Sequence, residues 1–484
     1  MKLRGLRAIV ITMCLLLSIP CATSAKGPLR VHPDNPRYFS DSTGEAIYLT
    51  GLHTWVNLQD GGREFPPPKF NYDQYLDLLK KHNHNFTRLW TWEGAVWRMP
   101  NSAGIWIDPL PFQRTGPGKA TDGRPKFDLT RFNDEFFERV RARATAAGDR
   151  GIYAGIMLFQ GFSVSRKSEK RLGSPWTYHP LNQANNVNGV DGDPDGDGEG
   201  YETHELQIAE VTRIQEAYVR KMIDKVNDLD NVFFEIGNEL HGDSTPWQYH
   251  MIEFIQRYER VKPKQHLVWM THQWDGLKGS GRSENLFNSP AEVISPTGGG
   301  ERGNYRTDPP VAEGRKLVLV DTDHVAATDV DRAEWAWKCF LRGLHPVFMD
   351  DPPVEGAVEH PRFTDTGPAS PAARTRVAMG DTLRFASRMK LAEILPTDDA
   401  ALCSTRYCLR NPGKEYLVYQ PETGPFDVNV VAGPYQFEWF DPSTHETIET
   451  GQKELADGST RFTPPVDGTV VLYLKSTTDE ENDY

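Results

Sequence analysis

The feature that most constrains the fold is a repeated alternation of short apolar runs with longer amphipathic segments between residues 46 and 396. Each run ends in polar or aromatic residues, as buried parallel strands do when they carry functional groups at their carboxyl ends. Strands are predicted at 46–50, 85–89, 152–159, 232–236, 266–270, 291–295, 317–320 and 346–349. Helices are predicted at 72–81, 130–147, 205–227, 247–260, 332–342 and 382–394. The pattern predicts an α/β fold, a (β/α)8 TIM barrel, with an open doubly wound sheet as the alternative.

The pattern changes after residue 396 to short strands separated by Gly- and Pro-containing turns. Strands are predicted at 415–420, 427–431, 435–440, 460–462 and 469–474. This spacing indicates a small all-β sandwich. We therefore expect a barrel domain over 26–396, a sandwich domain over 397–478 and a solvated acidic tail over 479–484.

The first 25 residues are typical of a secretory signal peptide. Lys2, Arg4 and Arg7 precede an apolar stretch over 8–17, and small residues lead to Ala25. Cleavage there would give a secreted or periplasmic protein that is not held in a membrane. Of the three cysteines left, Cys403 and Cys408 could form a disulfide or remain buried thiols.

The charge balance argues against a nucleic-acid partner. Lys and Arg number 54 against 67 acidic residues, a formal net charge of −13, and no basic run offsets it.

No cofactor is expected for catalysis: His204-Glu205 lacks the second histidine of a zinc protease, because Ile208 stands in its place.

Carboxylates follow two predicted strands on opposite sides of the barrel. Glu239 ends the fourth strand, and Asp321 and Asp323 follow the seventh. Carboxyl ends of barrel strands face the active site, and two carboxyl groups across one cavity suit glycoside hydrolysis, one as acid and the other as nucleophile. Arg88 ends the second strand and could hold the nucleophile ionised, or could simply pair with Glu93.

Aromatic and polar side chains cluster at the other strand ends. Aromatic rings stack on the apolar faces of sugars, while carboxylates, amides and imidazoles bind hydroxyl groups. Taken singly, each Trp is more typical of a core residue, and only the joint placement after strands favours a sugar site. The candidate substrate-binding residues are Arg88, Asn238, His53, Trp55, Trp90, Trp92, Glu93, His272, Trp274, Asp323, His324 and Asp350.

Two segments resemble the retaining glycoside hydrolases of clan A, which include the family 5 cellulases: 234–239, with the sequence FEIGNE, and 85–88, with NFTR. The resemblance implies that Glu239 is the acid/base, that Asn238 binds the sugar 2-hydroxyl and that Arg88 is the strand-two arginine. Clan members place glutamate where this chain has Asp321 or Asp323.

Most of the mature chain resembles apiosidase-like proteins more closely. Segments 37–39, 48–55, 415–419 and 439–442 carry this likeness. In that family a barrel precedes a β-sandwich that bears a collagen-binding label. The sandwich here shows no collagen-specific feature, so we expect no collagen partner.

Residues 191–202 fit a calcium-loop pattern throughout. The candidate ligands are Asp191, Asp193, Asp195, Glu199 and Glu202. A segment this rich in Asp and Gly also matches by chance, so a structural calcium site and a flexible acidic loop both remain open.

These features predict a secreted retaining glycosidase that acts on a polysaccharide or oligosaccharide, with Glu239 as acid/base and Asp321 as nucleophile. The alternative is a noncatalytic carbohydrate-binding protein on a barrel scaffold. A retaining pair should be about 5–5.5 Å apart and an inverting pair roughly 6.5–9.5 Å. The sequence does not predict the sugar or its linkage.

Overall fold

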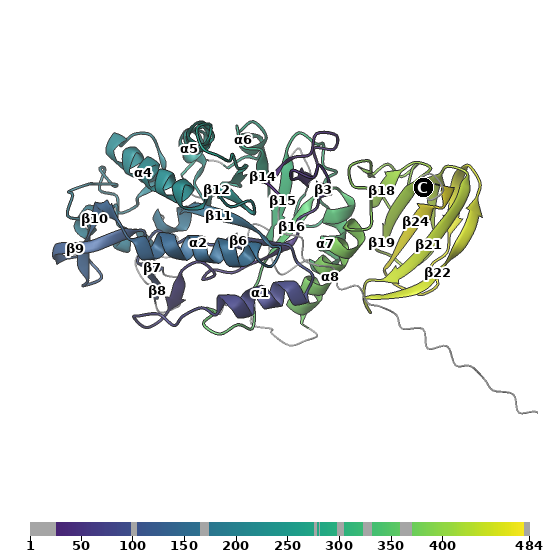
Figure 1. Cartoon of the computed structure of the whole chain (residues 1–484), viewed down its shortest axis with the longest axis horizontal. Helices are drawn as coiled ribbons and strands as arrows, with labels where there is room; N and C mark the ends of the chain where they lie inside the picture. Colours follow the sequence, from purple (N-terminus) through teal and green to yellow (C-terminus); the bar gives the residue numbers. More distant parts are fainter. Residues whose placement is uncertain are drawn as a thin grey trace, which may run out of the picture.

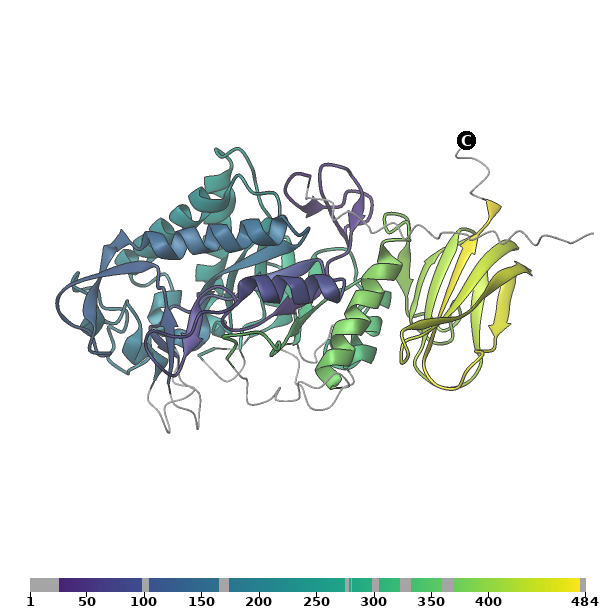
Figure 2. The same ribbon diagram turned by 60° about the horizontal axis from the view of Figure 1, so that its bottom comes forward.

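The computed structural model describes residues 26–97, 104–164, 174–274, 278–279, 281–297, 304–322, 332–358 and 370–478. Eight parallel strands close into a barrel (Figures 1 and 2). In chain order they are β4 (Gly51–His53), β6 (Phe86–Leu89), β11 (Tyr153–Gln160), β12 (Val232–Asn238), β13 (Val268–Thr271), β14 (Val293–Ser295), β15 (Leu317–Asp321) and β16 (His345–Met349). The predicted barrel is confirmed, and the open sheet is excluded because β16 pairs with β4.

Helices pack around the barrel, and three begin at side chains that accept a backbone N–H in the first turn: Asn71, Asn133 and Ser370. The helices are α1 (Tyr72–Lys81), α2 (Asp134–Gly148), α4 (Ala209–Val226), α5 (Thr245–Glu259), α6 (Ser283–Phe287), α7 (Arg332–Leu341) and α8 (Pro371–Ala386). Within the described ranges, none combines the length and apolar character needed to cross a bilayer.

The first predicted strand, 46–50, is wrong. Ala46–Ile47 is β3 of a small antiparallel sheet with β1 (Arg30–Val31) and β2 (Phe39–Ser40), and the barrel strand starts at Gly51. A Cβ at Gly51 would lie 1.8 Å from the carbonyl oxygen of Phe86, so glycine lets β4 and β6 approach. Leu29 and Phe39 pack with the apolar side chains at the amino ends of the barrel strands and close that end.

Three helix predictions have wrong starts. The segment 205–227 is helical only from Ala209, as α4, because the backbone at Glu205 is extended. The segment 130–147 begins as strand, because β10 (Pro125–Phe132) pairs with β9 (Phe112–Lys119) in an unpredicted hairpin, and α2 starts only after Asn133. The predicted helix 382–394 is α8 (Pro371–Ala386), which starts earlier because Ser370 caps it and Pro371 occupies its first position. It ends at Ala386, so 387–394 lies outside the helix.

The sandwich domain is also confirmed. Its larger sheet has the strand order β17 (Leu395–Thr397), β18 (Cys408–Asn411), β19 (Glu415–Gln420), β24 (Val470–Ser476), β21 (Gly433–Asp441) and β22 (Glu446–Leu455). The smaller sheet pairs β20 (Phe426–Val430) with β23 (Gly458–Phe462). Strand β22 was not predicted, because most of its residues are polar and exposed. Cys403 and Cys408 are buried free thiols between the sheets.

The larger sheet packs against α7 and α8 of the barrel (Figure 1). Trp337 stacks on Tyr419 at 6.1 Å, and Phe385 meets Phe440 edge-on at 5.4 Å. A separate three-stranded antiparallel sheet has the order β5 (Asp60–Gly62), β8 (Ile105–Asp108) and β7 (Val96–Trp97). The predicted signal peptide, 1–25, and the tail, 479–484, lie outside the described residues.

Candidate active site

Arg88 organises a fully buried cluster inside the carboxyl end of the barrel. Its Nε donates to Oε2 of Glu235 at 2.6 Å, and a terminal nitrogen pairs with Oε1 of the same carboxylate. The other terminal nitrogen donates to Oδ2 of Asp321 at 2.6 Å. Asn238 accepts a further hydrogen bond at 2.9 Å. The guanidinium therefore joins β6, β12 and β15, and the expected contact between Arg88 and the strand-seven carboxylate is present.

His53 holds the second oxygen of Asp321. The distance from Nε2 of His53 to Oδ1 of Asp321 is 2.8 Å, and neither side chain has exposed surface. The imidazole also stacks on the indole of Trp90, with the ring centroids 5.3 Å apart and the planes nearly parallel. Asp321 is thus held from two sides, by a cation and by an imidazole, which fixes its orientation.

Glu235 is a member of this cluster that sequence reasoning missed as a site residue. Burial raises the pKa of its carboxyl above the ordinary value; Arg88 opposes that rise and the neighbouring Asp321 charge adds to it. The available signal was a carboxylate in the middle of an apolar strand, because such a group is almost never buried without a partner.

Glu239 directly follows β12 and is partly exposed, unlike the fully buried Glu235. Its backbone has φ +51°, the left-handed conformation that costs a non-glycine residue roughly 1–2 kcal/mol. Gly161 lies against it so closely that a Cβ there would be 2.1 Å from the carbonyl oxygen of Glu239. The site therefore combines a partly exposed carboxyl at the end of β12 with a buried, ion-paired carboxyl at the end of β15.

The tryptophans differ in exposure. Trp90 and Trp92 are buried, and Trp92 donates from its indole nitrogen to the carbonyl oxygen of Trp55 at 2.8 Å. Trp274 is 36% exposed. His272 is buried just after β13. Of the four predicted tryptophans, Trp274 is thus the most exposed, while Trp55, Trp90 and Trp92 are buried.

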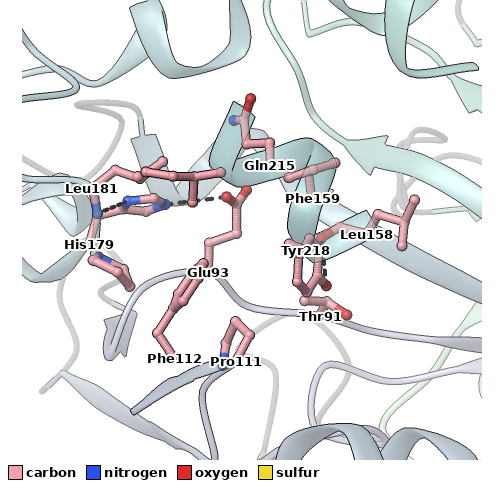
Figure 3. A pocket seen from close by; sticks show the side chains of 12 residues that line it. Thr91, Glu93, Pro111, Phe112, Leu158, Phe159, His179, Leu181, Gln215 and Tyr218 are labelled. Atoms are coloured by element: carbon pink, nitrogen blue, oxygen red, sulfur yellow. Dashed lines mark hydrogen bonds and ion pairs between the residues drawn. The ribbon is translucent and has the colours of Figure 1, made fainter. Parts of the chain in front are cut away.

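Glu93 joins an internal network with His179 and His204. Its carboxylate accepts the backbone N–H of Gln160 at 2.6 Å and contacts Nε2 of His179 and of His204 at 3.3 and 3.2 Å. Figure 3 shows this carboxylate beside a small cavity of about 30 Å³. Burial raises the pKa of Glu93, but the two imidazoles outweigh that and bring it to about 2.

Asp350 faces a helix. Nε and a terminal nitrogen of Arg376 in α8 donate to its two oxygens at 2.6 and 2.9 Å, and the residue is 1% exposed. The pairing ties β16 to α8. Asp323 and His324, which were predicted to bind substrate, lie outside the described residues.

Three of the five predicted metal ligands come together. Carboxylate oxygens of Asp193, Asp195 and Glu202 lie within 4.8 Å of one another. Asp191 and Glu199 are not part of that group. The donor set consists only of hard oxygen atoms, which suits Ca²⁺.

Comparison with known proteins supports the fold. A family model described as a domain of unknown function (DUF6298) matches residues 71–276, less than half of the chain. No curated protein matches. Among solved structures, one titled "Glycoside hydrolase" is 14% identical with a TM-score of 0.56, covering 93% of this chain and 97% of that one. A glycoside hydrolase family 5 structure from Bacteroides vulgatus ATCC 8482 is 15% identical with a TM-score of 0.57, covering 96% of each chain. The chain is thus similar in fold to these two structures over almost its whole length.

Proposed function

We propose that the protein is a retaining glycoside hydrolase exported from the cell, with a polysaccharide or oligosaccharide as substrate. The observation that carries the proposal is the Arg88 cluster, in which the end of β6 is bonded to the carboxylate that ends β15 and to Asn238, next to Glu239. One guanidinium thus joins β6, β12 and β15 at the carboxyl end of the barrel, the end at which the catalytic groups of such barrels lie.

The proposed mechanism assigns one role to each carboxyl group. Glu239, protonated, donates its proton to the glycosidic oxygen as the bond to the anomeric carbon breaks. Asp321 attacks that carbon and forms a glycosyl-enzyme ester, and Arg88 and His53 keep it ionised and oriented for the attack. Glu239, now deprotonated, takes a proton from the water that hydrolyses the ester. Asn238 is proposed to bind the sugar 2-hydroxyl, and Trp274 to stack on a sugar ring.

The complete burial of the Asp321 side chain is the observation that favours the noncatalytic alternative. A nucleophile must lie about 3–3.5 Å from the anomeric carbon. The proposal therefore requires that the residues which bury Asp321 move when substrate binds. A carbohydrate-binding protein would need no such access. The two functions therefore differ in whether Asp321 becomes reachable.

Substitution of Glu239 tests the acid/base role. On a natural substrate, Glu239→Gln should lower kcat by about 10²–10⁴-fold, because the leaving oxygen then departs unprotonated. The loss should be much smaller on a dinitrophenyl glycoside, whose leaving group needs no proton. Glu253→Gln, at an exposed position of α5, makes the same chemical change away from the site and should keep full activity. Equal loss on both substrates would contradict the role.

Azide rescue tests the nucleophile. With an activated glycoside, azide should restore turnover of Asp321→Ala and give a glycosyl azide of inverted configuration, because the anion fills the space of the missing carboxylate. Asp323→Ala should show no such rescue. Rescue of the Asp323 variant alone would transfer the role to that residue, and sugar binding by the wild type without hydrolysis would favour the noncatalytic alternative.

A further inference from the structure

The acidic loop before η4 (Tyr201–His204) carries an arrangement that the proposed reaction does not use. Carboxylate oxygens of Asp193, Asp195 and Glu202 lie within 4.8 Å of one another, although like charges at this distance repel. Asp193 is half-buried, Asp195 is exposed and Glu202 is buried, so the group reaches from solvent into the protein.

One oxygen of this group is buried and has no hydrogen-bond partner among the described residues. The side chain of Glu202 is 8% exposed, and the oxygen is its Oε2. Its other oxygen, Oε1, lies 3.3 Å from Nζ of Lys278, which is closer to Glu205 at 2.7 Å. Leaving a buried carboxylate oxygen unsatisfied costs about 1–3 kcal/mol, so a cation bound to Oε2 would remove that cost.

Backbone hydrogen bonds to Asp193 shape the acidic loop. The segment contains two overlapping Asp-x-Asp-x-Asp-Gly patterns, one from Asp191 and one from Asp193. The carboxylate of Asp193 accepts the N–H groups of Asp197 and Gly198 at 3.1 and 3.0 Å, which wraps the chain around this residue. Gly196 and Gly198 have φ +71° and +84°, the left-handed conformation that glycine adopts without strain at sharp turns. The backbone of the loop therefore turns around the Asp193 carboxylate.

We propose that Asp193, Asp195 and Glu202 bind one Ca²⁺ ion, with Oε2 of Glu202 as the buried ligand. Calcium accepts six to eight oxygen ligands in a flexible arrangement, so three carboxylates on a short loop can be completed by backbone carbonyl groups and water. Magnesium demands a tighter octahedral set and gives up its water reluctantly, which this open loop does not favour. The ion offsets the repulsion among the three carboxylates.

The position of the site gives the ion a structural role beside the candidate catalytic residue. Glu202 lies in η4, where the carbonyl oxygen of Tyr201 accepts a hydrogen bond from Nε2 of His241 at 3.2 Å. His241 is two residues after Glu239. The same short helix ends at His204, which contacts Glu93. A cation that holds η4 in place therefore supports the segment that carries Glu239.

Calcium binding by the full chain tests the site directly. After removal of divalent ions with a chelator, titration with CaCl2 in a calorimeter should show one site per chain, and saturating Ca²⁺ should raise the unfolding temperature. Asp193→Asn and Glu202→Gln should each weaken binding at least about tenfold, because ligand charge sets affinity in such loops. Each variant is first checked for native circular dichroism without calcium, so that a folding failure is not read as lost binding.

Glu199→Gln is the matched control, because it removes one charge from the same loop at a residue outside the three-carboxylate group. Its affinity for Ca²⁺ should change less than about threefold. An equal loss in the Glu199 variant would contradict the ligand set, and the absence of any heat or stabilisation with wild-type protein would overturn the site. None of these measurements depends on hydrolysis, so a failure of the calcium proposal can be told apart from a failure of the proposed function.

Discussion

At the scale of residues, the site depends on a single guanidinium that serves two buried carboxylates, Glu235 and Asp321. Two acids that share one cation in a buried position are stable only while that cation is present, because an unpaired buried charge is far more costly than the pair. Arg88 is also sandwiched between the rings of Trp90 and Trp269, at 4.7 and 5.2 Å from their centroids. It is therefore both a positioning residue and a structural one.

Arg88→Met should accordingly destabilise the protein by about 3–5 kcal/mol, measured as the free energy of unfolding in urea at pH 7. Arg213→Met provides the control, because the Arg213 side chain is 73% exposed and its ion pair with Glu210 lies on the surface. That variant should differ from wild type by less than about 0.5 kcal/mol. Similar losses in both variants would contradict the buried cluster.

The Glu93 network predicts a defined acid sensitivity. The pKa of Glu93 falls from 4.5 to about 2 on folding, so its contribution to stability is complete above pH 4.5 and is lost as the pH falls towards 2. Glu93→Gln should remove up to about 3 kcal/mol at neutral pH and flatten the decline of stability over that interval. Unfolding measured in urea from pH 6 to pH 2 checks this. A Glu93 variant with the same acid decline as wild type would show that other groups cause it.

Residue roles were partly predictable. The Asn238-Glu239 pair and Arg88 stand at strand ends, and the structure brings Arg88 and Asn238 together as that placement suggests. The sequence could not show that Glu93 contacts His179 or that Asp350 pairs with Arg376, because those partners lie 86 and 26 positions away in the chain. A strand end predicts which side chains are near the mouth, but the direction of each side chain depends on distant neighbours.

At the scale of elements, the candidate acid/base is held by the contact between the end of β12 and η1 (Gly161–Val164). A Cβ at Gly161 would fall 2.1 Å from the carbonyl oxygen of Glu239 and 2.7 Å from Cα of Leu240. Both contacts are with backbone, which cannot swing aside as a side chain can. The two segments therefore set the position of Glu239 jointly.

Gly161→Ala should displace Glu239 and lower kcat by about 10–100-fold, since a shift of roughly 1 Å can cost about 10²-fold. Gly94→Ala is a suitable control, because the nearest atoms to a Cβ there lie at 3.7 Å and its φ is not positive. Activity on a glycoside, compared with native circular dichroism, separates displacement from unfolding. Full activity in the Gly161 variant would mean that this contact does not position Glu239.

Element boundaries were predictable where local signals were strong. Helix α1 matches its prediction because Asn71 caps it and four buried apolar residues recur at helical spacing. Strands β9 and β22 were not predictable, because their residues are largely exposed and polar and so lack the apolar alternation that marks a strand. Pairing with a neighbouring strand, not burial, stabilises them.

At the scale of the whole molecule, the sandwich and the barrel share one apolar interface. Trp337 and Phe385 on the barrel helices contact Phe440 of β21, and all three are completely or almost completely buried. An interface with rings of this size couples the unfolding of the two domains. This architecture was predictable as two domains, but the docking of one on the other was not.

Phe440→Ala should therefore destabilise barrel and sandwich together, by about 3–5 kcal/mol, and the chain should still unfold in one transition. Differential scanning calorimetry measures both properties. Val431→Ala, at a residue 40% exposed in the same domain, should change the unfolding temperature little. A Phe440 variant in which only the sandwich melts earlier would show that the two domains are independent.

The central claim is that this barrel hydrolyses a glycosidic bond with retention of configuration. Purified wild-type protein should be incubated with a panel of glycans, and the first product followed by proton NMR before the sugar mutarotates. The account predicts a product whose anomeric configuration equals that of the bond cleaved. A product of opposite configuration would contradict the proposed double displacement by Asp321 and Glu239, and binding without cleavage across the panel would contradict hydrolysis itself.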